Sequence, residues 1–329
     1  MVGDQAAQPS GSYSCQYILR AWEQPNGPHI VSTLLTAKRV NKVGNGKAYE
    51  MLSCLNGALE YYRTVGGDRQ LLDACLNAWQ DIVAKRLYLT GAASYGELFH
   101  DDYDLPNVAN VGETCVTVTW LQFNAQLLRL TGEARFADQL EKVVLNQFLG
   151  AQRPDGTAWG YYVQMEGKKP YSDSLDGHCC LSSGPRGVAL IPTFAASTDA
   201  DGVVLNLYYA GTARLTLCDG TPVSLTTETR YPSDGRIRIV VNPTVPKTFA
   251  VKVRIPAWCR SASLAVNGNQ LVAKPAADGY VALQRTWTAV IRSNSISRWS
   301  LAWLSAITTI RERLRSNTAR SSFVPMSLS

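Results

Sequence analysis

Three cysteines and one glutamate have the residue types of a metal site. Glu113 and Cys115 stand in the segment Gly-Glu-Thr-Cys, and Cys179 and Cys180 follow each other directly. Two adjacent cysteines cannot easily form a disulfide with each other, but both thiolates could bind one ion. Three sulfurs and one carboxylate suit the tetrahedral shell of zinc. The sequence therefore indicates a zinc (Zn²⁺) site with Glu113, Cys115, Cys179 and Cys180 as ligands.

Each of these residues also has a simpler interpretation. Glu113 could be only a negative charge at a helix start, where the helix dipole favours acids. Cys115 could be a small buried residue, and the cysteine pair could occur by chance. The eight cysteines of this 329-residue chain do not form the dense, regular pattern of a disulfide scaffold. Residue types alone leave these alternatives open.

A helical period covers residues 47 to 151 and includes the segment that carries Glu113 and Cys115. Apolar residues recur there at three- and four-residue spacings, which predicts helices at about 113–131 and 134–150. Two links, at residues 63–68 and 129–133, each combine glycine with a following acid, a common way to end one helix and begin another. The repeated helical hairpins predict an α/α toroid or solenoid.

Near residue 195 the pattern changes to that of short strands. Residues 203–209, 236–241 and 250–255 are rich in β-branched side chains and alternate in polarity. Turn signals such as Asp219-Gly220 and Asn267-Gly268 separate the runs. We predict an antiparallel β-sandwich over residues 196–287.

The composition changes again after Trp287. Residues 288–329 contain no glycine, lysine or aspartate, and six arginines stand against one glutamate. The pattern predicts an irregular basic tail that is foreign or out of frame, with a helix at 299–315 as the alternative. This tail accounts for five of the six net positive charges. The preceding residues therefore lack the basic face of a nucleic-acid-binding protein.

No apolar run is long enough to cross a bilayer, so no membrane partner is expected. The first 14 residues are polar and lack the apolar segment of a secretory signal. As it stands, the sequence predicts a cytoplasmic protein.

Taken in order, Gly96-Glu97, Gly112-Glu113-Thr114-Cys115 and Cys179-Cys180 resemble segments of glycoside hydrolase family 127, the β-L-arabinofuranosidase family. The likeness covers roughly residues 30–287 and includes segments at 48–54 and 87–91. It implies a multidomain α+β protein, with part of an (α/α)6 six-hairpin barrel over residues 1–195 and a β-sandwich over 196–287. The helical hairpins number about half of those in a full barrel, so the resemblance predicts a chain that lacks an N-terminal part of the barrel.

The resemblance also implies roles for individual residues. Cys179 would be the nucleophile, Glu97 the acid/base, and Tyr162 a contact to the sugar. Glu113, Cys115 and Cys180 would hold zinc together with Cys179. The implied activity is retaining hydrolysis of a carbohydrate substrate, namely arabinofuranosides or related plant-type glycans. Zinc coordination would keep the nucleophilic thiol as a thiolate at neutral pH.

The segment after the cysteine pair departs from the family pattern. Relatives often continue with Pro and Asn, whereas this chain has Leu181-Ser-Ser-Gly-Pro-Arg186. The departure concerns the substrate more than the chemistry. Two other functions stay open: a catalytically inactive zinc-binding fragment or glycan-binding protein, and a zinc hydrolase that uses a metal-bound water. The latter needs an open zinc position, which four protein ligands leave only if Cys179 swings away.

Overall fold

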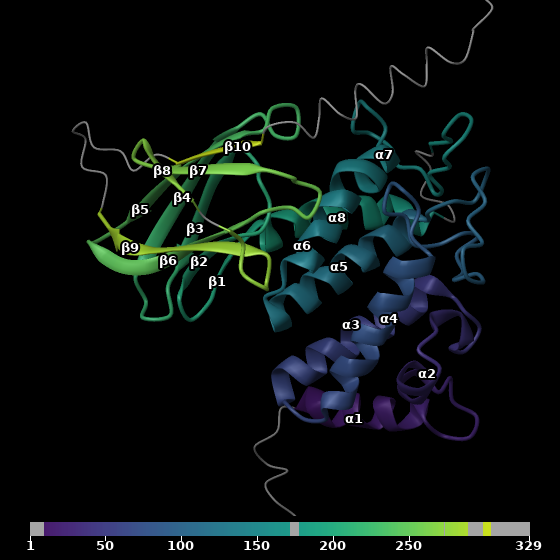
Figure 1. Cartoon of the computed structure of the whole chain (residues 1–329). Coiled ribbons are helices and arrows are strands. Elements are labelled where there is room, and N and C mark those ends of the chain that lie inside the picture. Colours follow the sequence, from purple (N-terminus) through teal and green to yellow (C-terminus); the bar gives the residue numbers. More distant parts are fainter. Residues whose placement is uncertain (1–9, 172–177, 273, 289–298, 304–329) are drawn as a thin grey trace, which may run out of the picture. The chain divides into compact units, whose positions relative to one another are not determined.

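The computed structural model describes residues 10–171, 178–272, 274–288 and 299–303 (Figure 1). The chain divides into two compact units, Met1–Pro192 and Thr193–Ser329.

The first unit is built from helices. They are α1 (Ser10–Trp22), α2 (Ile30–Thr36), the 3₁₀ turn η2 (Val40–Lys42), α3 (Ala48–Val65), α4 (Arg69–Lys85), α5 (Thr114–Thr131), α6 (Ala134–Lys142), the π-helical turn η3 (Val143–Phe148), α7 (Leu149–Ala151) and α8 (Cys179–Ala195), whose last residues belong to the second unit. Helix α3 packs against α4 and α5, and α5 packs against α6.

Amphipathic spacing explains which helix faces are buried. In α3, Met51, Leu52, Leu55 and Leu59 are buried at three- and four-residue intervals. The Asp68 carboxylate accepts a hydrogen bond from the Gln70 amide and caps the start of α4. The helices predicted at 113–131 and 134–150 are confirmed by α5 and by α6, η3 and α7 in succession.

Helix α8 was not predicted from the sequence. Pro185 and Pro192 lie inside it, and proline removes a backbone donor and disfavours a helix interior. The sequence therefore gave no indication that Cys179 and Cys180 open a helix.

The described residues of the second unit form strands in two sheets. The strands are β1 (Ala196–Thr198), β2 (Gly202–Leu205), β3 (Gly211–Thr216), β4 (Pro222–Thr229), β5 (Arg236–Pro243), β6 (Lys247–Arg254), β7 (Ala262–Val266), β8 (Asn269–Leu271), β9 (Tyr280–Trp287) and β10 (Trp299–Trp303). One sheet has the order β1-β2-β6-β9 and the other β3-β4-β5-β10-β7-β8. One buried apolar cluster draws on both sheets, with Val251 and Val281 from the first and Leu225, Ile239 and Leu264 from the second.

The expectation of a wholly antiparallel arrangement was wrong for one pair. Strands β2 and β6 pair in parallel, with Gly202 opposite Ala250. Between them the chain forms β3, β4 and β5 in the other sheet, so it returns to β6 by a long connection that permits parallel pairing. Turn signals in a sequence report hairpins and give no information about such a pair.

The expectation of an irregular tail was wrong for residues 299–303. Strand β10 pairs antiparallel with β5 on one side and with β7 on the other, so the helix considered for 299–315 does not begin there. Trp299, Leu301 and Trp303 alternate with Ser300 and Ala302, a period-two signal too short to stand out in a Ser- and Arg-rich segment. Residues 289–298 and 304–329 lie outside the described part of the chain.

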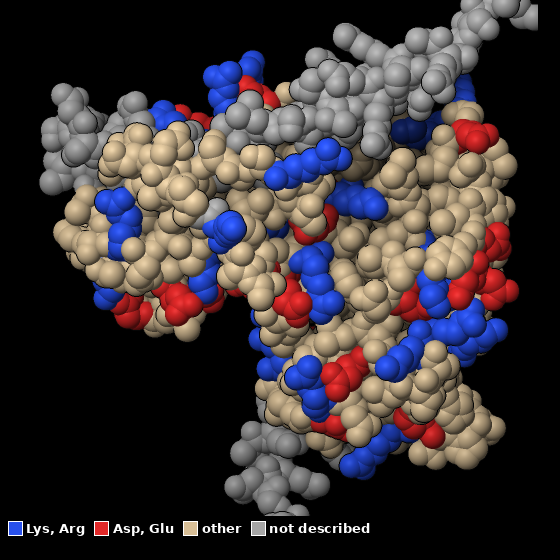
Figure 2. Space-filling model, in the orientation of Figure 1, with Lys and Arg blue, Asp and Glu red and all other residues tan. Residues whose placement is uncertain are grey.

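Charges of both signs are interspersed on the face of the helical unit seen in Figure 2. Among the described residues, no helix combines the length and apolar character needed to cross a membrane.

Candidate active site

The start of α5 fixes Glu113 and Cys115. Gly112 has a φ of +61°, and a Cβ there would come within 2.1 Å of Nε2 in the Gln147 side chain. This position therefore requires glycine. The Thr114 amide donates to the Tyr161 carbonyl at 3.0 Å, and the Thr114 hydroxyl donates to the Gly160 carbonyl at 2.7 Å. The segment that follows Trp159 is therefore attached to the first turn of α5.

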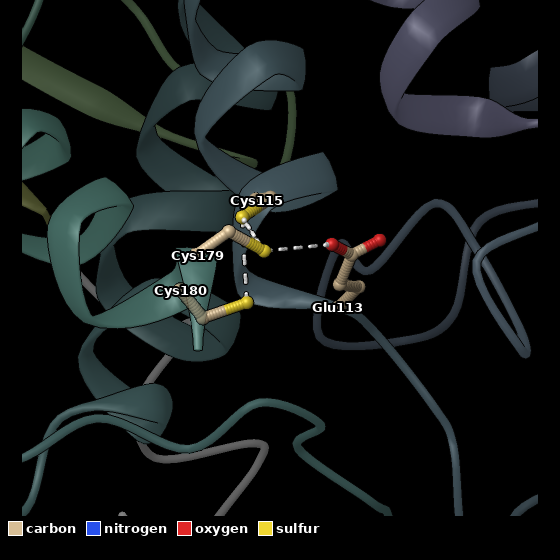
Figure 3. A group of neighbouring side chains, drawn as sticks. All are labelled: Glu113, Cys115, Cys179 and Cys180. Atoms are coloured by element: carbon tan, nitrogen blue, oxygen red, sulfur yellow. Dashed lines mark hydrogen bonds between the residues drawn. The ribbon is translucent and has the colours of Figure 1, made fainter. Parts of the chain in front are cut away.

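The cysteines from α5 and α8 converge with Glu113 (Figure 3). The Cys115 sulfur lies 3.1 Å from the Cys179 sulfur and 3.4 Å from the Cys180 sulfur. The Cys179 sulfur is 3.9 Å from Glu113 Oε1. One ligand atom from each of the four residues lies within 4.8 Å of all the others. The structure thus brings together all four residues that the sequence suggested as metal ligands.

Burial and charge make this cluster a suitable cation site. Glu113, Cys115 and Cys180 are buried, whereas Cys179 is exposed. Burial, followed by the nearby charge of Glu97, raises the pKa of Glu113 to about 7. Burial and a hydrogen bond with Cys115 raise the pKa of Cys179 to about 11. Four acids this close resist ionising together, and a bound divalent cation would offset their repulsion. The donor set could therefore hold a metal ion.

Glu97 lies in a second group of polar side chains. Its Oε1 accepts hydrogen bonds from the Tyr161 hydroxyl at 2.7 Å and the Tyr162 hydroxyl at 3.1 Å. Its Oε2 forms an ion pair with the Lys47 ammonium. The Lys47 and Tyr161 hydrogen bonds keep the pKa of Glu97 below its usual value. At neutral pH Glu97 is therefore a carboxylate.

Tyr161 connects the two groups. Its hydroxyl donates to Glu97, while its backbone carbonyl lies 3.8 Å from the Cys180 sulfur. Its ring packs edge-on against His178, the residue before Cys179, with ring centroids 5.7 Å apart. The Glu97 carboxylate and the cysteine cluster are therefore two sides of one site.

A buried ion network holds the loop that carries Glu97. The Arg86 side chain is 3% exposed and donates to both oxygens of Asp81, at 3.0 and 3.4 Å. It also donates to the His100 carbonyl and, at 2.9 Å, to Asp102. Lys85 contacts the same Asp102 carboxylate at 3.1 Å. These contacts anchor the loop three to five residues beyond Glu97, and they give Asp102 a structural role.

Sequence patterns missed Tyr161 and Arg86. Tyr161 and Tyr162 are adjacent in Trp-Gly-Tyr-Tyr, and the family resemblance implied a role only for Tyr162. Both hydroxyls nevertheless reach Glu97. Arg86 follows a helical run with no motif around it, so its contacts become visible only in three dimensions.

The family model described as the β-L-arabinofuranosidase GH127 catalytic domain matches residues 23–193, more than half of the chain. The chain belongs to glycoside hydrolase family 127. A second model, the GH127 middle domain, matches residues 202–292. All four clustered residues, together with Glu97, fall inside the stretch matched by the GH127 catalytic domain.

Similar GH127 proteins agree in sequence and in fold. A non-reducing end β-L-arabinofuranosidase of Bifidobacterium longum is 33% identical over 240 residues, which cover 66% of this chain and 36% of that protein. The crystal structure of a GH127 β-L-arabinofuranosidase from Geobacillus stearothermophilus T6 aligns with a TM-score of 0.72 and 25% identity over 78% of this chain and 42% of that one.

A second solved structure, named as a GH127 β-arabinofuranosidase, aligns with a TM-score of 0.74 and 25% identity over 85% of this chain and 45% of that one. The GH127 chain described here therefore spans between a third and a half of the length of these relatives.

Proposed function

We propose that this chain carries the catalytic site of a retaining glycoside hydrolase that acts on β-L-arabinofuranosides or related plant-type glycans. In this proposal Cys179 is the nucleophile and Glu97 the acid/base. The observation that carries it is the contact of Tyr161 with both groups, which puts a three-cysteine cluster beside a hydrogen-bonded carboxylate. The names of the relatives support the sugar class.

Zinc is the metal that we propose for the cluster. Glu113, Cys115, Cys179 and Cys180 would hold it, because zinc accepts tetrahedral sulfur and carboxylate ligands. When bound, Zn²⁺ would keep the thiols deprotonated at neutral pH. Without a cation the pKa of Cys179 is about 11, so little thiolate would be present.

Exposure favours Cys179 as the nucleophile. Cys115 and Cys180 are buried, so among the three clustered sulfurs the one on Cys179 can meet a sugar from outside. In the first step the Cys179 sulfur would bond to the anomeric carbon as the carbon–oxygen bond breaks, and Glu97 would protonate the departing oxygen. In the second step water would attack the same carbon, Glu97 would accept a proton from it, and the sulfur would leave.

The surroundings of Glu97 fit the second step directly. Three donors, Lys47 and the two tyrosines, stabilise the carboxylate that activates water. The first step requires Glu97 to carry a proton. We therefore infer that the bound sugar competes for these donors, and that Tyr162 contacts the sugar while Lys47 sets the charge of Glu97.

For the fold, we propose that the helical unit is part of an (α/α)6 barrel and that the second unit is a β-sandwich. The helical hairpins α3–α4 and α5–α6 support the first assignment, and the apolar cluster shared by two sheets supports the second. We propose that the second domain begins near residue 195 and extends past residue 287, because β10 pairs with β5 and β7.

The alternative is a catalytically inactive zinc-binding fragment or a glycan-binding protein. The partial coverage favours it, because this chain spans 36% and 42% of the length of those two relatives.

Hydrolysis of an aryl β-L-arabinofuranoside by the zinc-loaded chain tests the proposal. We expect Cys179→Ser to abolish turnover, and Glu97→Gln to lower kcat about 10²- to 10⁴-fold for a poor leaving group and less for an activated aryl group. Turnover that survives Cys179→Ser would refute the assignment of Cys179 as the nucleophile. Zinc binding without turnover would favour the fragment.

A further inference from the structure

Ser183 lies one turn beyond Cys179 in α8 and is 3% exposed. Its Oγ is 3.1 Å from the Cys115 sulfur and 3.1 Å from Nη2 of Arg186. Within the described part of the chain, these are the two polar neighbours of the Ser183 hydroxyl.

Close packing of α8 puts Ser183 in this place. A Cβ at Gly184 would come within 2.1 Å of the Trp159 ring, and one at Gly187 within 2.6 Å of Phe148 and 2.8 Å of Val118 in α5. Both positions therefore need glycine for α8 to approach its neighbours so closely. The approach brings Ser183 within hydrogen-bonding distance of a sulfur on a different helix.

The donors and acceptors around the Ser183 hydroxyl determine where its proton points. A guanidinium has donors but no acceptor, so the Ser183 oxygen accepts from Arg186. The single hydroxyl proton of Ser183 is then left for the Cys115 sulfur. A metal-bound Cys115 has no proton of its own, so it can only accept this bond. Donation from a charged Arg186 polarises the hydroxyl and strengthens its bond to sulfur.

We propose that Ser183 and Arg186 act as positioning residues for the metal centre, by orienting the Cys115 sulfur and stabilising it as a ligand. The inference rests on the metal centre of the proposed function and adds two residues that are not ligands. Partners of this kind fix the orientation of a ligand and strengthen metal binding, and their loss commonly lowers metal affinity about 10- to 100-fold.

Metal titration of the whole chain tests the inference without any measurement of turnover. Co²⁺ serves as the probe, because its thiolate complexes absorb visible light, and competition with a chelator then gives the Zn²⁺ affinity. We expect Ser183→Ala to weaken both affinities about 10-fold or more. Ser182→Ala is the matched control, because Ser182 is exposed and donates to the Cys179 carbonyl rather than to a sulfur. It should bind like the wild type.

The Arg186 contribution has its own test. Arg186→Ala should weaken binding in the wild-type background but not in the Ser183→Ala background, because we place Arg186 as acting through Ser183. An equal loss in both backgrounds would overturn this part.

If the wild type binds metal and Ser183→Ala binds it with the same affinity, the inference is overturned and the proposed metal centre stands. Absence of binding in the wild type would overturn both. Circular dichroism confirms that each variant is folded.

Discussion

The Lys47 ammonium contacts the Glu97 carboxylate across 50 residues of sequence. Lys47 precedes the first residue of α3, and Glu97 lies in the loop after α4 with a φ of +68°. Their segments are joined by a hydrogen bond from the Ala48 amide to the Glu97 carbonyl at 2.9 Å. Lys47 and Glu97 are therefore joined through their side chains and through the backbone, so the charge of Lys47 acts directly on the Glu97 carboxylate.

Replacing Lys47 with methionine should raise the pKa of Glu97, because the largest cause of its depression is the Lys47 hydrogen bond. A carboxyl with a lowered pKa stabilises the fold above the pKa it has when unfolded, and this stabilisation is lost as pH falls through the folded value. Lys47→Met should therefore weaken the dependence of stability on pH in the acid range.

Titration of the Glu97 carboxyl by NMR measures this effect directly. Lys42→Met is the control, because Lys42 is an exposed lysine of the neighbouring turn η2. Equal Glu97 titration curves in the wild type and in Lys47→Met would contradict the assigned role.

Glu113 should make the metal-free chain less stable as pH rises. Its pKa is raised from 4.5 to about 7, mainly by burial. Between these values the folded chain holds a proton that the unfolded chain has released, so the free energy of unfolding falls, by about 3 kcal/mol in total.

Urea denaturation at pH 5 and pH 7 measures the difference. Glu113→Gln should lack this component, and metal loading should suppress it in the wild type. An identical pH dependence for metal-free wild type and Glu113→Gln would be evidence against the prediction.

The chain should bind about one equivalent of zinc through the cysteine cluster. Because the site joins α5 to α8, zinc at 100 times its Kd should stabilise the fold by about 3 kcal/mol and raise Tm by roughly 5–10 °C. Cys115→Ser should lose most of the metal. Cys218→Ser changes an exposed cysteine of the second unit and should keep it. Metal analysis that finds equal zinc in both variants would eliminate the site.

Arg86→Met should destabilise the helical unit by about 3 kcal/mol, because it removes the main partner of the buried Asp81 carboxylate. Arg63→Met is the control. It breaks an exposed i,i+3 pair with Glu60, so its effect on the free energy of unfolding should be much smaller. Denaturant unfolding gives both values, and similar losses for the two variants would show that the Arg86 network is not stabilising.

Strand β10 should stabilise the second unit. A chain that ends at residue 303 keeps β10, whereas one that ends at residue 298 exposes the edges of β5 and β7 that it covers. The shorter chain should therefore have the lower Tm for unfolding of the second unit. Equal melting of the two truncated chains would contradict the assigned strand.

The sequence predicted the parts of the site that depend on local pattern. Glu113 and Cys115 follow a glycine at the start of a periodic helix, so their place at its N-terminus could be read directly. The meeting of Cys115 with Cys180 could be suggested only from residue type, because no local rule relates two helices 65 residues apart.

What the sequence did not predict depends on tertiary contacts that override local preference. Pro185 argues against a helix, yet α8 forms because it packs through Gly184 and Gly187. Strand β10 is short and lies in a Ser- and Arg-rich segment. Its pairing with β5 and β7 outweighs this weak local strand signal. Arg86 has no motif around it, and its contacts with Asp81, the His100 carbonyl and Asp102 follow from how the loop after α4 folds back.

Covalent labelling of Cys179 tests the central claim most directly. The zinc-loaded chain is exposed to an arabinofuranose mimic that carries a thiol-reactive group at the anomeric position, and the intact mass is measured before peptide mapping. We predict one added label, located on Cys179, absent from Cys179→Ser and retained in Cys218→Ser. A zinc-loaded chain that binds the mimic but takes up no label, or one labelled equally in Cys179→Ser, would contradict the assignment of Cys179 as the nucleophile.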